Sequence, residues 1–136
     1  MNLNEFISEH DNTYVHFDKV WGAQCMDLFR VYVEKVLKFN QTPLVRNAYA
    51  VWLTNSSDFE RIKNAPDNFP LPGDIVIWHW RYGGTGHIAI AVDGCTSTKL
   101  ICFSQNDPTN SKARIREYKN YNYVLGWLRP RNNVVQ

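Results

Sequence analysis

The chain has 136 residues, a length that fits one domain with a single hydrophobic core. Hydrophobic residues make up 44% and charged residues 21%, a composition typical of a globular protein and not of a disordered or membrane-embedded one. The formal net charge of +2 is too small to indicate nucleic-acid binding, and no apolar run is long enough to cross a bilayer.

The first half of the chain has the patterns of helices. Apolar residues spaced three and four apart, with capping residues before them, predict helices over residues 3–10, 24–38, 45–53 and 58–63. Pro66, Pro70 and Pro72 then interrupt regular structure. The second half is rich in β-branched and aromatic residues and predicts strands over residues 74–80, 87–92, 100–106, 114–118 and 123–128.

Helices followed by strands predict an α+β fold, with N-terminal helices packed on a mainly antiparallel sheet. We expect residues 1–136 to form a single domain. The segment from residue 130 onward is expected to be a tail or the start of a linker.

Cys25 stands at the start of the most regular helix pattern. Its neighbours three and four residues on are apolar, which places Cys25 on the buried face in the first turn. Unbonded N–H groups and the helix dipole favour the thiolate at such a position, and the thiolate is the nucleophile. The alternative is that this cysteine only packs in the core, as buried cysteines often do.

The strand over residues 87–92 carries a histidine at its first position. Strict alternation places His87, Ala89 and Ala91 on one face. We expect the two small alanines to let a helix approach closely and bring Cys25 beside the imidazole. On the strand over residues 100–106, Asn106 is the polar end of a mostly apolar face.

Cys25, His87 and Asn106 supply a nucleophile, a base and a group to orient the base, which is the set that a cysteine hydrolase needs. The other two cysteines are weaker candidates: Cys102 is expected in the core and Cys95 in an exposed turn. Three cysteines complete no disulfide framework and match no zinc pattern, so at least one thiol is free.

The loop before the cysteine has the spacing of a calcium loop. Its ligands would be side chains and carbonyls of His16, Asp18, Val20, Gly22 and Asp27. Two carboxylates are few for calcium. The alternative is that Asp27 is a first-turn acid favoured by the helix dipole and that Asp18 lies on the surface.

Aromatic residues near His87 are candidates for a substrate groove. They are Trp78, Trp80 and Tyr82, followed by the glycine-rich loop Gly83–Gly86. The alternative is that these rings only pack against the sheet.

Four motifs in this order resemble those of the CHAP domain, the cysteine, histidine-dependent amidohydrolase/peptidase family of the papain-like and NlpC/P60 group. They are Gly22-Ala23-Gln24-Cys25-Met26-Asp27, the segment Pro70–Trp78, Gly86-His87-Ile88-Ala89-Ile90 and Ser104-Gln105-Asn106. The resemblance covers residues 14–130 and implies a papain-like α+β fold.

The resemblance also implies a function, a peptidoglycan hydrolase of the phage lysin type. Such an enzyme cleaves an amide bond of the cell wall through a thioester, as an N-acetylmuramoyl-L-alanine amidase or as a stem or cross-bridge endopeptidase. It implies Cys25 as nucleophile, His87 as base and Asn106 as the orienting partner. The Cys25 N–H and the Gln24 side chain are expected to bind the oxyanion.

Two implications of the resemblance meet departures in this chain. Ser104 stands where some relatives carry an acid, so it is at most an auxiliary residue. Several phage members bind calcium before the cysteine with more carboxylates than this loop has. Calcium is therefore at most structural here, and the chemistry requires no cofactor.

Two other functions stay open, a non-catalytic wall-binding module of the same fold and a transpeptidase or amidotransferase with the same triad. The expected partner is bacterial peptidoglycan, with no nucleic acid and no membrane, for a monomer that a separate wall-binding domain could accompany. The first twelve residues lack the pattern of a signal peptide. The protein is expected to be made in the cytoplasm of an infected host or carried on a virion, and to act on the cell wall.

Overall fold

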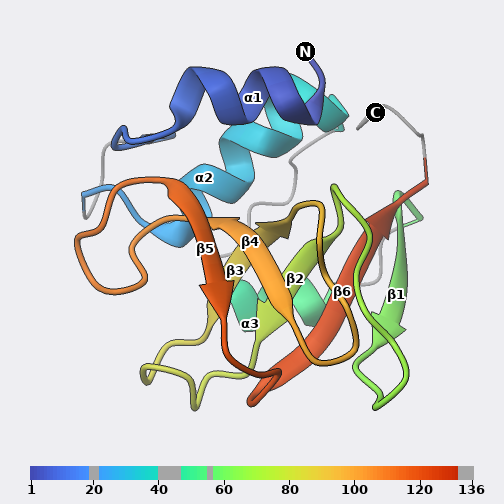
Figure 1. Cartoon of the computed structure of the whole chain (residues 1–136). Coiled ribbons are helices and arrows are strands. Elements are labelled where there is room, and N and C mark those ends of the chain that lie inside the picture. The colour runs from blue at the N-terminus through green and yellow to red at the C-terminus, as the bar shows by residue number, and fades with distance from the viewer. Residues whose placement is uncertain (19–21, 40–46, 55–56, 132–136) are drawn as a thin grey trace.

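A computed structural model describes residues 1–18, 22–39, 47–54 and 57–131. Three α-helices and a six-stranded sheet are formed by these residues (Figure 1). The helices are α1 (Leu3–His10), α2 (Cys25–Tyr32), which continues as a π-helical turn over Val33–Leu37, and α3 (Ala48–Leu53). The strands are β1 (Phe59–Lys63), β2 (Ile75–Trp78), β3 (His87–Ala91), β4 (Leu100–Ser104), β5 (Arg114–Tyr118) and β6 (Val124–Pro130).

All pairings in the sheet are antiparallel, and the strand order is β1-β6-β2-β3-β4-β5. The strand β3, which carries His87, therefore lies inside the sheet between β2 and β4. In Figure 1, α1 and α2 lie together above the sheet and α3 lies behind it. The predicted α+β fold is confirmed.

The helices cover one face of the sheet. Leu28 and Tyr32 of α2 share a buried cluster with Ile88 and Ile90 of β3. The Tyr32 hydroxyl donates to the Gly73 carbonyl at 3.0 Å, which ties the middle of the helix to the residues before β2. The start of α2 is thus held next to the start of β3.

The expectation for the alanine face of β3 is wrong. Ala89 and Ala91 do not receive α2; they pack with Trp78, Trp127 and other residues in a second buried cluster on the opposite face. The small side chains make room for large rings there, while the branched side chains of the other face meet the helices. His87 shares the aromatic face.

Residues 58–63 form no helix, which corrects a second expectation. Residues Phe59–Lys63 are β1, an edge strand paired with β6 along its whole length. Gly126 of β6 lets β1 lie close, because a Cβ there would meet the Ile62 carbonyl and the ring of Trp52. Pairing with a distant segment therefore decided the conformation of this short stretch.

Smaller differences concern the ends of elements. The strand expected over 74–80 ends at Trp78, and β6 continues to Pro130, which pairs with Phe59. The expected helix over 45–53 begins in residues outside the described part, where α3 starts at Ala48. Cys102 is buried, as expected, and Cys95 is half-buried instead of exposed. No described helix is long and apolar enough to span a membrane.

Candidate active site

The start of α2 is fixed by its own first turn. Gln24, the N-cap, donates its backbone N–H to Asp27 Oδ2 at 3.0 Å. The other carboxylate oxygen, Oδ1, accepts the backbone N–H of Phe17 at 3.3 Å. Asp27 thus closes the helix start and holds the preceding loop, which leaves Cys25 as the first residue of the helix.

Gln105 joins this loop to the end of β4. Its side chain is fully buried and makes three hydrogen bonds with the segment before Cys25. The Val15 N–H donates to Gln105 Oε1 at 2.7 Å, and Nε2 donates to the carbonyls of Val15 at 2.9 Å and Gln24 at 2.8 Å. The carboxamide therefore sets the position of the residue directly before the cysteine.

Cys25 lies against the start of β3. Its pKa is raised to about 11 by burial, and the backbone N–H of Ile88 acts on the sulfur in the opposite direction. Ile88 directly follows His87, so the thiol lies beside the residue pair that begins β3. The N–H groups of Cys25 and Met26 at the helix start act to lower this pKa, as expected, but burial outweighs them.

His87 is the first residue of β3 and is 3% exposed. Its ring lies against Trp78, with 5.0 Å between ring centroids, and near Tyr82 and Tyr118 at 6.1 and 6.5 Å. Its Nε2 forms a hydrogen bond with Ser104 Oγ at 2.8 Å. Burial lowers the pKa of His87 to about 4, which favours the neutral imidazole, the form that can accept a proton.

A carboxylate lies on the same side of the ring. Asp107 Oδ2 is 3.7 Å from His87 Nε2 and accepts hydrogen bonds from the hydroxyls of Tyr118 at 2.7 Å and Tyr82 at 2.8 Å. Its Oδ1 lies 3.1 Å from Arg116 Nη1. Although burial acts to raise the pKa of Asp107, these neighbours lower it overall, so the group is ionised at neutral pH.

Asn106 lies in the turn after β4, and its side chain serves that turn. Its Oδ1 accepts the backbone N–H of Asn110 at 2.7 Å, and its backbone has a φ of 63°. The hydrogen bond to the His87 ring comes instead from Ser104, two residues earlier. The third group beside the histidine thus differs from the sequence prediction.

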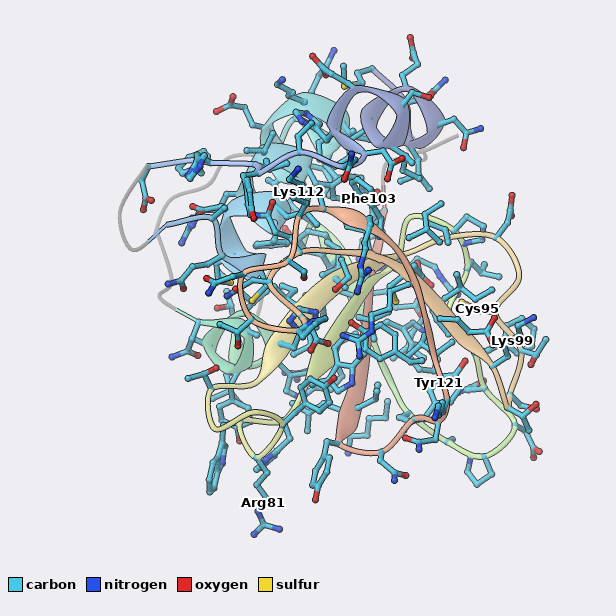
Figure 2. All side chains as sticks on the ribbon, turned by 60° about the vertical axis from the view of Figure 1, so that its left-hand side comes forward. Arg81, Cys95, Lys99, Phe103, Lys112 and Tyr121 are labelled. Carbon is cyan, nitrogen blue, oxygen red and sulfur yellow. The ribbon has the colours of Figure 1, made fainter. Side chains whose placement is uncertain are left out.

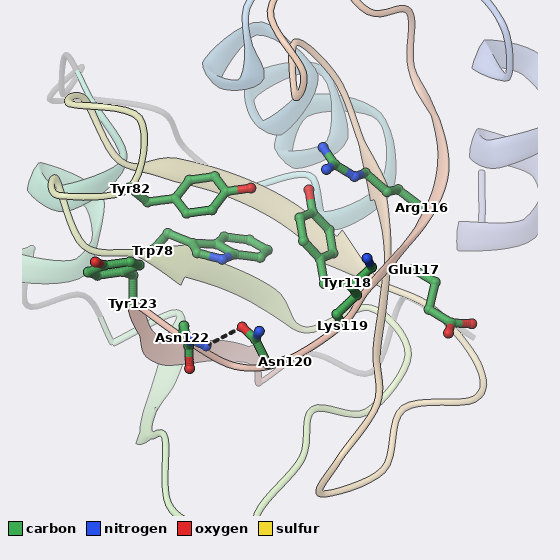
Figure 3. Close-up of a pocket in the computed structure, with 9 residues that line it drawn as sticks. All are labelled: Trp78, Tyr82, Arg116, Glu117, Tyr118, Lys119, Asn120, Asn122 and Tyr123. Carbon is green, nitrogen blue, oxygen red and sulfur yellow. Dashed lines mark hydrogen bonds between the residues drawn. The ribbon is translucent and has the colours of Figure 1, made fainter.

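A cavity of about 350 Å³ lies on the aromatic face of the sheet, next to this network (Figure 3). Trp78 and Tyr82 line it, together with Tyr118, which contacts the His87 ring. The rest of the lining comes from β5 and the residues after it: Arg116, Glu117, Lys119, Asn120, Asn122 and Tyr123. The cavity is therefore one aromatic wall away from the imidazole.

Trp80 does not line this cavity. It is 50% exposed in the loop after β2, and the Arg81 guanidinium lies 5.7 Å from the centre of its ring. Figure 2 shows Arg81 pointing away from the body of the protein. Of the three predicted groove residues, the structure brings Trp78 and Tyr82 to the cavity and leaves Trp80 at the surface.

The described residues of the calcium pattern do not fit a calcium ion. Both Asp27 oxygens accept backbone N–H groups, and His16 and Asp18 are exposed. Arg30 already faces the two carboxylates: burial lowers its pKa, and Asp18 and Asp27 act to raise it. Val20 lies outside the described residues, and within the described part no three metal-binding side chains come together.

Three residues of the site are missing from the sequence prediction: Gln105, Asp107 and Tyr118. Gln105 had a detectable signal, because alternation puts this polar residue on the apolar face of Ile101 and Phe103. Asp107 and Tyr118 had none, since the first follows the strand and the second is one of several tyrosines. In the pairing of β4 with β5, Tyr118 lies opposite Leu100, and its hydroxyl reaches Ser104 Oγ at 3.0 Å.

A buried histidine on a sheet and a cysteine at the start of the helix packed on it define a papain-like α+β protein. The CHAP domain family model matches residues 11–106, which is more than half of the chain, and the chain belongs to this family. It is similar to the crystal structure of an endolysin, LysIME-EF1, with a TM-score of 0.74 and 27% identity. The match covers 96% of this chain and 64% of that one, and no curated protein sequence matches.

Proposed function

We propose that this protein is a peptidoglycan hydrolase that cleaves an amide bond of the bacterial cell wall through Cys25. One observation carries the proposal: the Cys25 sulfur lies at the backbone N–H of Ile88, and the preceding residue, His87, is buried and neutral. Membership of the CHAP family and the similarity to an endolysin give the substrate class.

The reaction starts from two neutral groups. Burial favours the thiol of Cys25 and the neutral imidazole of His87, so the proton moves from sulfur to nitrogen as the sulfur attacks the amide carbonyl. The tetrahedral intermediate breaks when His87 gives this proton to the leaving amine. A thioester remains, and His87 then takes a proton from the water that hydrolyses it.

The oxyanion of the tetrahedral intermediate forms at the helix start. The backbone N–H of Cys25 and the Gln24 side chain are the donors we assign to it, and each such donor contributes about 3 kcal/mol in well-studied enzymes. The hydrogen bond from Gln105 to the Gln24 carbonyl keeps this segment in place.

The cavity next to His87 is the groove that we assign to the leaving part of the substrate. His87 protonates the leaving amine, so the fragment with that amine departs on the histidine side. In each candidate bond this fragment is a peptide. Tyr82 offers it apolar surface, with Trp78 packed behind at 1% exposure. Lys119 adds a positive charge that suits peptide carboxylates, in a lining that also holds Arg116 and Glu117.

No step of this mechanism involves a metal ion. Both carboxylate oxygens of Asp27 accept backbone N–H groups, and Arg30 supplies positive charge near Asp18 and Asp27. Because these contacts take the place of a cation, we expect chelation with EDTA to leave the hydrolytic rate unchanged.

Digestion of purified peptidoglycan tests the proposal. Wild-type protein is expected to release soluble fragments, and mass spectrometry of their new amine and carboxyl ends identifies an amidase or an endopeptidase. Cys25→Ala should release none, whereas Cys95→Ala, a matched change at a half-buried cysteine outside the site, should retain the activity.

Binding of the walls without release of fragments by the wild type would contradict the proposal and favour a wall-binding module. New amide bonds formed with an added amine, with no net hydrolysis, would favour a transpeptidase.

A further inference from the structure

His87 and three neighbouring side chains form a continuous chain of hydrogen bonds. His87 Nε2 lies 2.8 Å from Ser104 Oγ, Ser104 Oγ lies 3.0 Å from the Tyr118 hydroxyl, and that hydroxyl lies 2.7 Å from Asp107 Oδ2. Ser104, Tyr118 and His87 are all buried. Water therefore does not compete for the hydrogen bonds between these side chains.

We propose that Asp107, acting through Tyr118 and Ser104, fixes His87 in the tautomer that carries its proton on Nε2. The three residues are positioning residues: they act on the base and touch no reacting atom. The proposal rests on the proposed function for its catalytic meaning, but the tautomer itself is a property of the protein without substrate.

The direction of every hydrogen bond follows from the carboxylate. An ionised carboxylate only accepts, so Tyr118 must donate its single hydroxyl hydrogen to Asp107. Its oxygen can then only accept from Ser104, which uses the one hydrogen of that hydroxyl. Ser104 Oγ must accept at its other contact, and the donor there is Nε2–H of His87.

This tautomer leaves Nδ1 with its lone pair, so Nδ1 is the nitrogen that takes the proton of Cys25. When it does, the positive ring has Asp107 3.7 Å from Nε2, and the carboxylate stabilises the imidazolium. No proton travels along the chain, since Nε2 keeps its hydrogen throughout. Where some relatives carry an acid, this chain has Ser104, and Tyr118 connects it to the carboxylate of Asp107.

Tyr82 supplies a matched control. Its hydroxyl donates to the same oxygen of Asp107, at 2.8 Å, but it lies outside the chain that leads to Ser104. Tyr118→Phe and Tyr82→Phe each remove one hydroxyl from Asp107 and keep the ring. Only Tyr118→Phe frees the Ser104 hydrogen to turn toward the imidazole.

Nitrogen-15 NMR of the histidine ring measures the tautomer directly. We expect wild type and Tyr82→Phe to show a protonated Nε2 and an unprotonated Nδ1 at His87, with the signals assigned by their loss in His87→Gln. Tyr118→Phe and Ser104→Ala should show a new population with the proton on Nδ1. A protonated Nδ1 in the wild type would overturn the proposal, and so would an unchanged tautomer in both Tyr118→Phe and Ser104→Ala.

Steady-state kinetics on soluble wall fragments supply the second readout. Both variants keep the ring that lines the cavity, so any change in KM should be similar in the two. Tyr118→Phe should lower kcat about tenfold, and Tyr82→Phe should lower kcat far less. Equal kcat values for the two variants would contradict the proposed action of Asp107 through Tyr118 and Ser104. If the wild type hydrolyses nothing while the NMR result holds, the proposed function fails and the tautomer assignment stands.

Discussion

Adjacent residues at the end of β4 control the two halves of the candidate site. Ser104 and Gln105 leave opposite faces of the strand. Ser104 bonds the ring of His87 on the aromatic face, and Gln105 bonds the segment before Cys25 on the helical face. A shift of register by one residue at this point would therefore remove both contacts at once.

Cys25 and His87 could be singled out from residue type, spacing and family resemblance, and the structure places the Cys25 sulfur at the backbone N–H of Ile88, the residue after His87. The group beside the imidazole could not be assigned. Asn106 and Asp107 are neighbours in sequence, and only the backbone of the turn decides which of them lies near the ring. Periodicity carries no information about a turn.

Alkylation of Cys25 tests the charge state of the thiol. Because burial raises its pKa to about 11, the rate of reaction with iodoacetamide should rise steadily from neutral to alkaline pH. Cys25→Ala measures the background from the other two cysteines. A rate that is already maximal below neutral pH would show a thiolate–imidazolium pair instead of two neutral groups.

At the scale of elements, the connection from β2 to β3 sets the position of His87. Gly86 precedes the histidine with a φ of 77°, and a Cβ there would lie 2.9 Å from the Trp78 carbonyl oxygen. Its N–H donates to the Tyr82 carbonyl at 2.9 Å. A side chain at this position must therefore displace the start of β3.

Gly86→Ala should lower both activity and stability. We expect a loss of about 1–3 kcal/mol in the free energy of unfolding and at least about a tenfold loss of kcat/KM, because the imidazole moves with the strand. Gly84→Ala is the matched control, since Gly84 has a φ of 83° in the same loop but open space around it. Urea unfolding and wall hydrolysis measure the two effects, and equal losses in both variants would contradict the steric argument.

The turn after β5 adds a positive charge to the cavity. Lys119 and Arg116 line the cavity, and Arg116 Nη1 lies 3.1 Å from Asp107 Oδ1. The Glu117 carboxylate lies 3.6 Å from Lys99 Nζ and is partly neutralised there. Lys119→Gln should raise KM about threefold with kcat unchanged, and added salt should remove the difference. Lys63→Gln, on β1 at the other edge of the sheet, removes the same charge and should leave KM unchanged. An equal rise in KM in both variants would assign the effect to net charge.

For the whole molecule, the division into helices and sheet follows from the sequence, but the assignment of faces does not. Alternation along β3 places His87 and Ala89 on the same face of the sheet. It does not show whether that face packs against the helices or lies on the opposite side. Residues 58–63 likewise have a helix-compatible composition, and only pairing with β6, more than sixty residues away in sequence, makes them a strand. Contacts between distant segments decided both.

The buried base also links folding to pH. His87 has a pKa of about 4 in the folded protein against an ordinary value of 6.5, so between these values the unfolded chain binds more protons. Stability should therefore be constant above pH 6.5 with respect to this group, fall as the pH drops to about 4, and lose about 3 kcal/mol in total.

The pKa of Asp107 is lowered in the folded protein, so its protonation in acid also reduces the free energy of unfolding. This second loss occurs only at the acidic pH values where carboxylates titrate. Urea unfolding at a series of pH values measures the slope, and His87→Gln should flatten it between pH 6.5 and 4 whatever its effect on absolute stability. His10→Gln is the comparison, since burial lowers the pKa of His10 too but this residue lies on α1, away from the site. If the slope survives in His87→Gln, the imidazole is not held neutral by burial, and the mechanism must begin from a charged base.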